Sequence, residues 1–206
     1  MANHYTNKVT CFACNYNCQL INGSAEPIYH CNLKKAISWP DNNIYFREGL
    51  HHLLFREETR IFCRGHIFLD FSLYNIRYFT NRDWIQLLKP LGLKVIIICD
   101  PIMAPLAAFW YLQESIIYTI LFAKNVFNEL GSISTYPASK YITKENTSIK
   151  ALNNLEFKFI SLILNGNSIK RISTILNVNL KKSYNIYQSI CRKMGVDLKL
   201  LLRLHC

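Results

Sequence analysis

A short segment near the end of the chain combines side chains that can recognise base pairs with side chains that can bind phosphate. The candidates for base-edge contacts are Lys182, Tyr184, Asn185 and Gln188. The candidates for phosphate contacts are Lys170, Lys181, Arg192 and Lys193. Asn and Gln amides form paired hydrogen bonds with adenine in the major groove of DNA, whereas Lys reaches guanine or a phosphate. These residues therefore indicate binding to double-stranded DNA.

Three amphipathic segments predict the helices that would hold these side chains. Apolar residues that recur at helical spacing give each segment one apolar face. The segments are 155–163, 172–176 and 183–194. Gly166 and Asn179 fall in the two breaks between them, where helix ends and helix caps favour Gly and Asn. Two helices joined by such a short turn form a helix-turn-helix, whose second helix enters the major groove, and we predict this helix over 180–194.

Positive charge is concentrated in the same part of the chain. Residues 140–206 hold 12 Lys and Arg against 3 Asp and Glu, whereas the whole chain has a net charge of +11. The first 139 residues therefore contribute a net charge of only +2. A basic domain attached to a nearly neutral one is the charge distribution expected of a DNA-binding protein. The alternative is a small helical bundle with a solvated basic face and no DNA ligand.

Over 152–196 the sequence resembles the LuxR/FixJ-type helix-turn-helix domain without a gap. The matching positions are Leu152, Glu156, Ile160, Leu162, Gly166, Ser168, Lys170, Ile172, Leu176, Val178, Ile190, Arg192, Lys193 and Gly195. The resemblance implies an all-α, four-helix, LuxR-type DNA-binding domain over 151–206, with dimer contacts on the fourth helix. These contacts would involve Leu198, Leu201 and Leu202. Ser183 departs from the family pattern, which usually has an apolar β-branched residue at this position.

The preceding residues predict an α/β domain over 1–130, followed by a polar linker over 131–150. Short apolar runs that alternate with possible helices indicate buried strands of a parallel sheet. The predicted strands are 8–14, 64–70, 94–99 and 116–122, and the predicted helices are 83–91 and 125–130. Such a domain in front of a LuxR-type domain resembles the receiver domain of response regulators. Asp70, at the end of a predicted strand, stands where the phosphoacceptor of a receiver would lie.

The resemblance to a receiver is incomplete, because a receiver needs an acidic pair after its first strand to hold Mg²⁺. The stretch expected there, residues 14–17, has the sequence CNYN and no carboxylate. We therefore expect a degenerate, receiver-like pairing domain without an acidic metal site, in which Asp70 caps a turn. The architecture resembles that of the auxiliary Rcs regulators of enteric bacteria, which control capsule. This resemblance implies a phosphorylation-independent regulator that forms a homodimer or a heterodimer with a response regulator.

Other classes of protein have weaker support in the sequence. Zinc sites usually use two paired cysteine motifs, whereas this chain has one C-x2-C pair, Cys11 and Cys14. We expect buried thiols in a reducing cytoplasm, with no metal and no cofactor. The apolar stretch 93–122 is interrupted by Asp100 and Pro105, so no membrane-spanning helix is expected. No phosphate-binding glycine loop and no nucleophile–base set points to an enzyme.

The leading prediction is a cytoplasmic, sequence-specific, DNA-binding transcription regulator that acts as a dimer. Three alternatives stay open. The first is a phosphorylated response regulator that uses Asp70. The second is a protein-interaction module that works mainly by pairing with another regulator, and the third is a LuxR-type regulator that senses a small ligand through its front domain.

Overall fold

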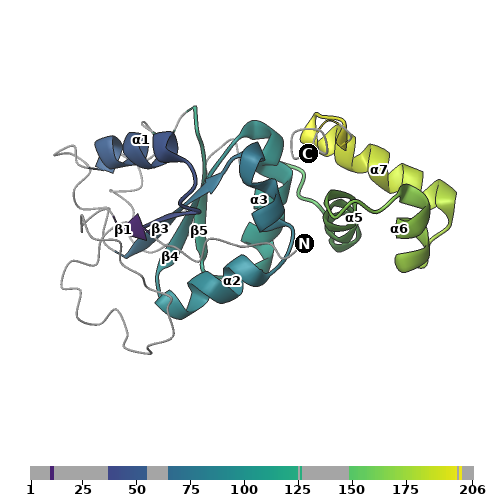
Figure 1. Ribbon diagram of the computed structural model, residues 1–206, viewed down its shortest axis with the longest axis horizontal. Coiled ribbons are helices and arrows are strands. Elements are labelled where there is room, and N and C mark those ends of the chain that lie inside the picture. The colour runs from purple at the N-terminus through teal and green to yellow at the C-terminus, as the bar shows by residue number, and fades with distance from the viewer. Residues whose placement is uncertain are drawn as a thin grey trace.

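The fold is described from a computed structural model of the chain. The structure describes residues 10–11, 37–54, 65–124, 126, 149–198 and 200. Within this part of the chain, an α/β unit is followed by a helical unit (Figure 1). The predicted fold class, an α/β domain with a parallel sheet and a C-terminal helix-turn-helix domain, is confirmed.

The α/β unit is built on a five-stranded sheet whose strands lie side by side in chain order. The strands are β1 (Thr10–Cys11), β2 (Ile37–Trp39), β3 (His66–Phe71), β4 (Lys94–Cys99) and β5 (Ile117–Phe122). β1 pairs with β2 in antiparallel orientation, and the other neighbouring strands are parallel. The three longer strands are almost entirely buried, which explains why their sequences are continuously apolar rather than alternating.

Helices pack on both faces of the sheet (Figure 1). On one face, α1 (Ile44–Leu54) packs through Leu50 and Leu54 against Phe68. The elements on the other face are η3 (Leu73–Phe79), α2 (Asp83–Leu88), η4 (Lys89–Leu91), η5 (Pro101–Met103) and α3 (Ala104–Gln113). Three aromatic side chains from these elements, Phe79, Trp84 and Trp110, pack edge to face at the centre of this second layer.

The order of the strands corrects one step of the sequence analysis. The predicted strands 64–70, 94–99 and 116–122 agree with β3, β4 and β5 to within two residues. Of the run at 8–14, the structure describes residues 10 and 11, which form β1. The strand beside β3 is β2, which was not predicted, and Asp41 follows it closely. Our expectation that CNYN occupies this position, with no carboxylate nearby, was therefore wrong.

The helical unit contains α5 (Asn154–Leu164), α6 (Ile169–Ile175) and α7 (Leu180–Met194). The predicted second helix of the helix-turn-helix, 180–194, is confirmed to the residue. Each helix begins at a side-chain cap, because Asn153, Ser168 and Asn179 each accept a hydrogen bond from a backbone N–H of the first turn. Gly195 ends α7 with a φ of 68°, a left-handed conformation that glycine adopts without strain.

The two units are packed against each other rather than merely joined. The ring of Phe157 on α5 stacks on Phe109 of α3, with centroids 4.4 Å apart, and meets the edge of Trp110 at 5.1 Å. The backbone N–H of Leu152 donates a hydrogen bond to the carbonyl of Pro105 at 3.0 Å. Helix α3 is therefore covered by the sheet on one side and by the helical unit on the other, and a single apolar core runs through both units.

Of the predicted linker, only residues 149 and 150 lie within the described part; of the predicted helix 125–130, only Val126 does.

Candidate nucleic-acid interface

One face of α7 is exposed and polar, and the opposite face is buried. Ser183, Ile186, Tyr187, Ile190 and Met194 form the buried face. The exposed side chains on the other face are Lys181, Lys182, Tyr184, Asn185, Gln188 and Arg192. The structure therefore brings together, on one helix surface, all four predicted base-contact residues and two of the predicted phosphate-contact residues. These positions recur at helical spacing, so the side chains point to the same side of the helix.

Helix α6 lies directly before α7 and adds further positive charge. Lys170 and Arg171 are both exposed in its first turn. The sequence analysis named Lys170 but missed Arg171, although both follow the Ser168 cap. The chain turns into α7 through Asn177 and Asn179. Asn177 has a left-handed conformation with a φ of 51°, and the side chain of Asn179 caps α7. This arrangement matches a helix-turn-helix, in which the first helix crosses the DNA backbone and the second enters the groove.

Lys193 does not share the exposed face of its neighbour Arg192. Its ammonium nitrogen lies 2.6 Å from a carboxylate oxygen of Glu156 and 2.9 Å from the carbonyl oxygen of Ala151. The side chain of Glu156 is only 4% exposed and that of Lys193 is 20% exposed. Lys193 was expected to bind a DNA phosphate. In the structure its ammonium group pairs with this buried acid, because Lys193 borders the apolar stripe that packs on α5.

Glu156 is the centre of a hydrogen-bond network that joins α5 to α7. Its carboxylate accepts hydrogen bonds from the Asn153 backbone N–H at 2.8 Å and from the Ser189 hydroxyl at 2.7 Å, in addition to the bond from Lys193. Burial alone would raise the pKa of this carboxyl. The hydrogen bonds and the charge of Lys193 outweigh burial, so the pKa of Glu156 lies below its ordinary value. The network therefore holds a charged carboxylate between the two helices.

One of the three predicted dimer-contact residues lies in the described part of the chain. Leu198 is fully buried within the core of its own chain. The hydroxyl of Tyr187 donates a hydrogen bond to Asp197, which holds this segment against α7. The other two predicted dimer residues, Leu201 and Leu202, lie outside the described residues.

Asp70 lies at the end of β3, as predicted, and is almost completely buried. Burial raises the pKa of its carboxyl, and the nearby charge of Asp100 adds to this effect, whereas hydrogen bonds from Asn43 and Ser72 oppose it. The side-chain amide of Asn43 donates to Asp70 at 2.9 Å. Asp70 therefore accepts a hydrogen bond from the segment that follows β2.

The two other acids at this edge of the sheet are also held by protein groups. Asp41 forms an ion pair with Arg47 at 3.2 Å, and Asp100 accepts a hydrogen bond from the Leu73 backbone N–H at 3.0 Å. Within the described stretches, no three His, Cys, Asp or Glu side chains lie close enough to hold a metal ion. Asp41 and Asp100 are thus each engaged by another group of the chain.

Two findings concern the remaining predictions. Among the residues that the structure places, Cys99 and Cys191 are not joined in disulfides, and Cys99 is buried as expected. The side chains of the predicted C-x2-C pair lie outside the described residues. None of the helices in the described part of the chain is long and apolar enough to cross a membrane.

Comparisons with known proteins place these observations in context. Residues 10–134 match the family model of the EcpR N-terminal domain. Over 201 residues the chain is 25% identical to the uncharacterized protein YqeH of Escherichia coli (strain K12), and the match covers 96% of this chain and 94% of that protein. A solved structure of two RcsB dimers bound to two parallel DNAs is 16% identical, with a TM-score of 0.44, and covers 82% of this chain and 94% of its own. A structure of the two-component response regulator RcsB in complex with DNA is 17% identical, with a TM-score of 0.46, and covers 80% and 94%.

Proposed function

The chain belongs to the family of the EcpR N-terminal domain, and we propose that it is a sequence-specific, DNA-binding transcription regulator. The match to the family domain ends at residue 134, before the helical unit begins. The observation that carries the proposal is the surface of α7, where Lys182, Asn185 and Gln188 are exposed opposite a fully packed apolar face. Amides and amines at these positions supply the hydrogen-bonding groups that distinguish base pairs in the major groove.

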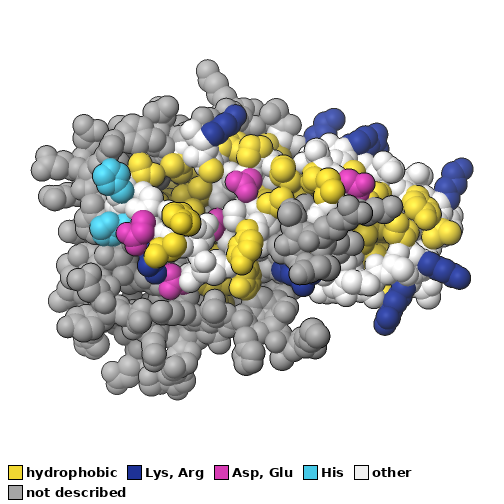
Figure 2. Space-filling view, turned by 45° about the horizontal axis from the view of Figure 1, so that its top comes forward, with side chains coloured by type: hydrophobic (Ala, Val, Ile, Leu, Met, Phe, Trp, Pro, Cys, Tyr) yellow, Lys and Arg dark blue, Asp and Glu magenta, His cyan; other side chains and the backbone are white. Residues whose placement is uncertain are grey.

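In this proposal, α7 lies in the major groove and α6 lies over the DNA backbone. Lys182, Tyr184, Asn185 and Gln188 face the base edges. Lys170, Arg171, Lys181 and Arg192 contact phosphates. Lys and Arg side chains gather around the helical end of the molecule (Figure 2), so the field there attracts a polyanion. Each phosphate contact releases condensed counterions, and binding should therefore weaken steeply as salt rises.

We further propose that the α/β unit works by pairing, without phosphorylation. The hydrogen bond from Asn43 to Asp70 supports the second part of this proposal, as do the protein groups that engage Asp41 and Asp100. Exposed apolar side chains support the first part, because Tyr45 is 88% exposed and Tyr74 is 69% exposed. Asn42 hydrogen-bonds to Asn75 at 2.8 Å and so holds the segments of these two tyrosines together. The partner is a second copy of the chain or a response regulator.

The test is selection of DNA from a library of random duplexes by the full chain, followed by sequencing. We expect a defined motif to be enriched, and we expect the double variant Tyr184→Ala, Asn185→Ala to lose this enrichment. Gln86→Ala, an exposed position on α2, serves as the control and should select the same motif as the wild type. If the wild-type chain selects no motif, or binds no duplex even at low salt, the proposal is wrong.

A further inference from the structure

The exposed surface of α7 begins with an aliphatic side chain. Leu180, the first residue of α7, is 46% exposed, and Tyr184, one turn later, is 50% exposed. Residues four positions apart lie on the same side of a helix, so the two side chains are neighbours on the surface. Leu180 is not among the buried residues of α7, which pack into the core. The first turn of α7 therefore presents an apolar group beside the polar side chains of the proposed DNA contact.

Positively charged side chains flank Leu180. Lys181 and Lys182 follow it in the first turn of α7 and are exposed. Lys170 and Arg171 are exposed in the first turn of α6, the helix that packs against α7. Figure 2 shows hydrophobic side chains exposed between Lys and Arg side chains at the helical end of the molecule. The core of a protein–protein interface is depleted of lysine, so this mixture fits a polyanion that carries apolar groups better than an apolar protein surface.

Double-stranded DNA is a polyanion of this kind. Its phosphates border the major groove, and the C5-methyl group of thymine is the apolar group that the base pairs present there. The other groups on the base edges in this groove are hydrogen-bond donors and acceptors. An aliphatic side chain cannot pair with them, so its contact with a polar edge would displace water without replacing the lost hydrogen bond. Contact with a thymine methyl instead buries apolar surface on both molecules.

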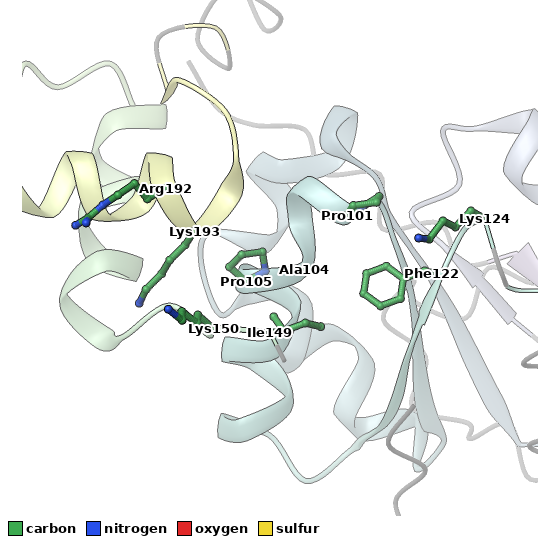
Figure 3. Close-up of a pocket in the computed structure, with 9 residues that line it drawn as sticks. All are labelled: Pro101, Ala104, Pro105, Phe122, Lys124, Ile149, Lys150, Arg192 and Lys193. Atoms are coloured by element: carbon green, nitrogen blue, oxygen red, sulfur yellow. The ribbon is translucent and has the colours of Figure 1, made fainter. Parts of the chain in front are cut away.

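The position of α7 in the fold leaves its first turn accessible to a duplex. The last turn lies against the α/β unit, where Arg192 and Lys193 line a pocket together with Pro101 and Pro105 (Figure 3). The first turn lies at the opposite end of the helix, beside α6 and away from the sheet (Figure 1). In a helix-turn-helix, the residues at the N-terminal end of the second helix contact base edges. The fold therefore favours deep insertion of the turn that carries Leu180.

We propose that Leu180 packs against the C5-methyl group of a thymine in the major groove, so that one A·T pair is a required part of the recognised sequence. This inference rests on the proposed function and deepens it, because it names a base that the chain selects. The polar side chains of α7 recognise bases through hydrogen bonds, whereas Leu180 recognises the methyl group through burial. The exposed part of Leu180 is the surface that this contact covers.

The test replaces each thymine of a selected duplex by uracil, one position at a time. Uracil lacks the C5-methyl group but keeps the O4 acceptor and the pairing with adenine. At one position, we expect uracil to weaken binding of the full wild-type chain by about fourfold, the loss that corresponds to one buried methyl group. Leu180→Ala should weaken binding to the thymine duplex by about fourfold or more, and uracil at this position should weaken it no further. Fluorescence anisotropy at one salt concentration measures the four affinities.

Ile175→Ala is the matched control for this variant. It also removes an aliphatic side chain, which is 50% exposed, but from the last turn of α6. The control should respond to uracil as the wild type does. Leu180→Ala should keep the helix, because the side chain is exposed and alanine favours helices. Circular dichroism of the two variants checks this point.

The outcomes separate this inference from the function on which it rests. If the wild-type chain selects no motif, both are wrong. If the motif requires no A·T pair, or if uracil is tolerated at every thymine, the regulator function stands and the methyl contact is overturned. The assignment to Leu180 is also overturned if Leu180→Ala keeps the wild-type response to uracil, or if Ile175→Ala loses this response to the same extent.

Discussion

The ammonium nitrogen of Lys193 lies 2.6 Å from the carboxylate of Glu156 and joins the last turn of α7 to the first turn of α5. The Asn153 backbone and Ser189 complete the hydrogen bonds of the carboxylate. A charged pair of this kind has a preferred geometry, so it fixes where the end of α7 lies on α5. In the proposed function, Lys193 would therefore act on DNA binding indirectly, by orienting the helix that carries the exposed side chains.

We predict that Lys193→Gln lowers the free energy of unfolding by about 2–3 kcal/mol. Removing one partner of a buried pair leaves the other charge without compensation, and the partial exposure of Lys193 reduces the cost of this loss. Arg192→Gln is the matched control, because the neighbouring side chain is exposed and should change stability by less than about 0.5 kcal/mol. Urea unfolding followed by circular dichroism measures both variants. Equal losses at the two positions would show that the pair has no special role.

The same pair predicts the response of the helical unit to acid. The pKa of Glu156 in the folded chain lies below its ordinary value, so its carboxylate stabilises the fold above the unfolded pKa. This contribution is lost as the pH falls through the lower, folded pKa. Glu156→Gln should therefore be less stable than the wild type near pH 7, and the difference should shrink below about pH 4. A difference that stays constant between these two pH values in thermal unfolding would contradict this assignment.

The contribution of Asp70 to the stability of the fold should depend on pH in the opposite way. Burial raises the pKa of this carboxyl in the folded chain, so any stabilisation is present below the unfolded pKa and is lost as the pH rises through the folded pKa. An amide at this position can still accept the hydrogen bond from Asn43 and carries no charge. We expect Asp70→Asn to be as stable as the wild type or more stable near neutral pH, with unchanged DNA binding. Two outcomes would favour phosphorylation. One is loss of DNA binding in this variant, and the other is DNA binding that acetyl phosphate strengthens in the wild type but not in the variant.

We predict that one substitution at Ser183 stabilises the fold. Its side chain is completely buried in α7, and its hydroxyl has no hydrogen-bond partner among the described residues. Ser183→Ala removes an unpaired buried polar group and should raise the free energy of unfolding by about 1 kcal/mol. Ser173→Ala is the control, because the Ser173 hydroxyl donates a hydrogen bond to the Lys170 carbonyl at 2.6 Å and its removal should not stabilise the fold. Chemical denaturation compares the two, and a loss of stability in Ser183→Ala would reveal a partner for its hydroxyl.

A substitution at Asn185 tests whether this side chain recognises a base. Replacement by Ala should weaken binding to a selected duplex by about 1–3 kcal/mol and should leave binding to a scrambled duplex nearly unchanged. The side chain is exposed, so the stability of the fold should not change. Fluorescence anisotropy with both duplexes at one salt concentration measures the difference. An equal loss on the two duplexes would place Asn185 on a phosphate.

The helical unit could be predicted well because its signals are local. The Ser168 and Asn179 caps, the breaks at Gly166 and Gly195, and the apolar spacing between them determine each helix from its own residues. The inward turn of Lys193 was missed, although the residue directly precedes Met194 and therefore borders the buried stripe. Its partner, Glu156, comes from another helix, and neither periodicity nor charge indicates which cation such an acid will select.

The α/β unit was predicted less completely because its arrangement is not local. β2 has three residues, too few for a period to be recognised, and its place beside β3 depends on pairing across the sheet. The apolar run at 8–14 looked like a stronger strand, and its two described residues pair with β2 at the edge of the sheet. The position of Asp41 follows from this order of strands, so it could not be read from the neighbourhood of Asp41 in the sequence.

Helix α3 has its two long sides in contact with different units, and this restricts how the chain can be rearranged. A chimera that joins this helix-turn-helix to another α/β domain would expose Phe157 and Leu152 to water unless the foreign domain carried a surface equivalent to that of Phe109 and Pro105. The outer surface of α3 and the inner surface of α5 must therefore be inherited, exchanged or redesigned together. The natural unit for transplantation is the whole chain rather than either half.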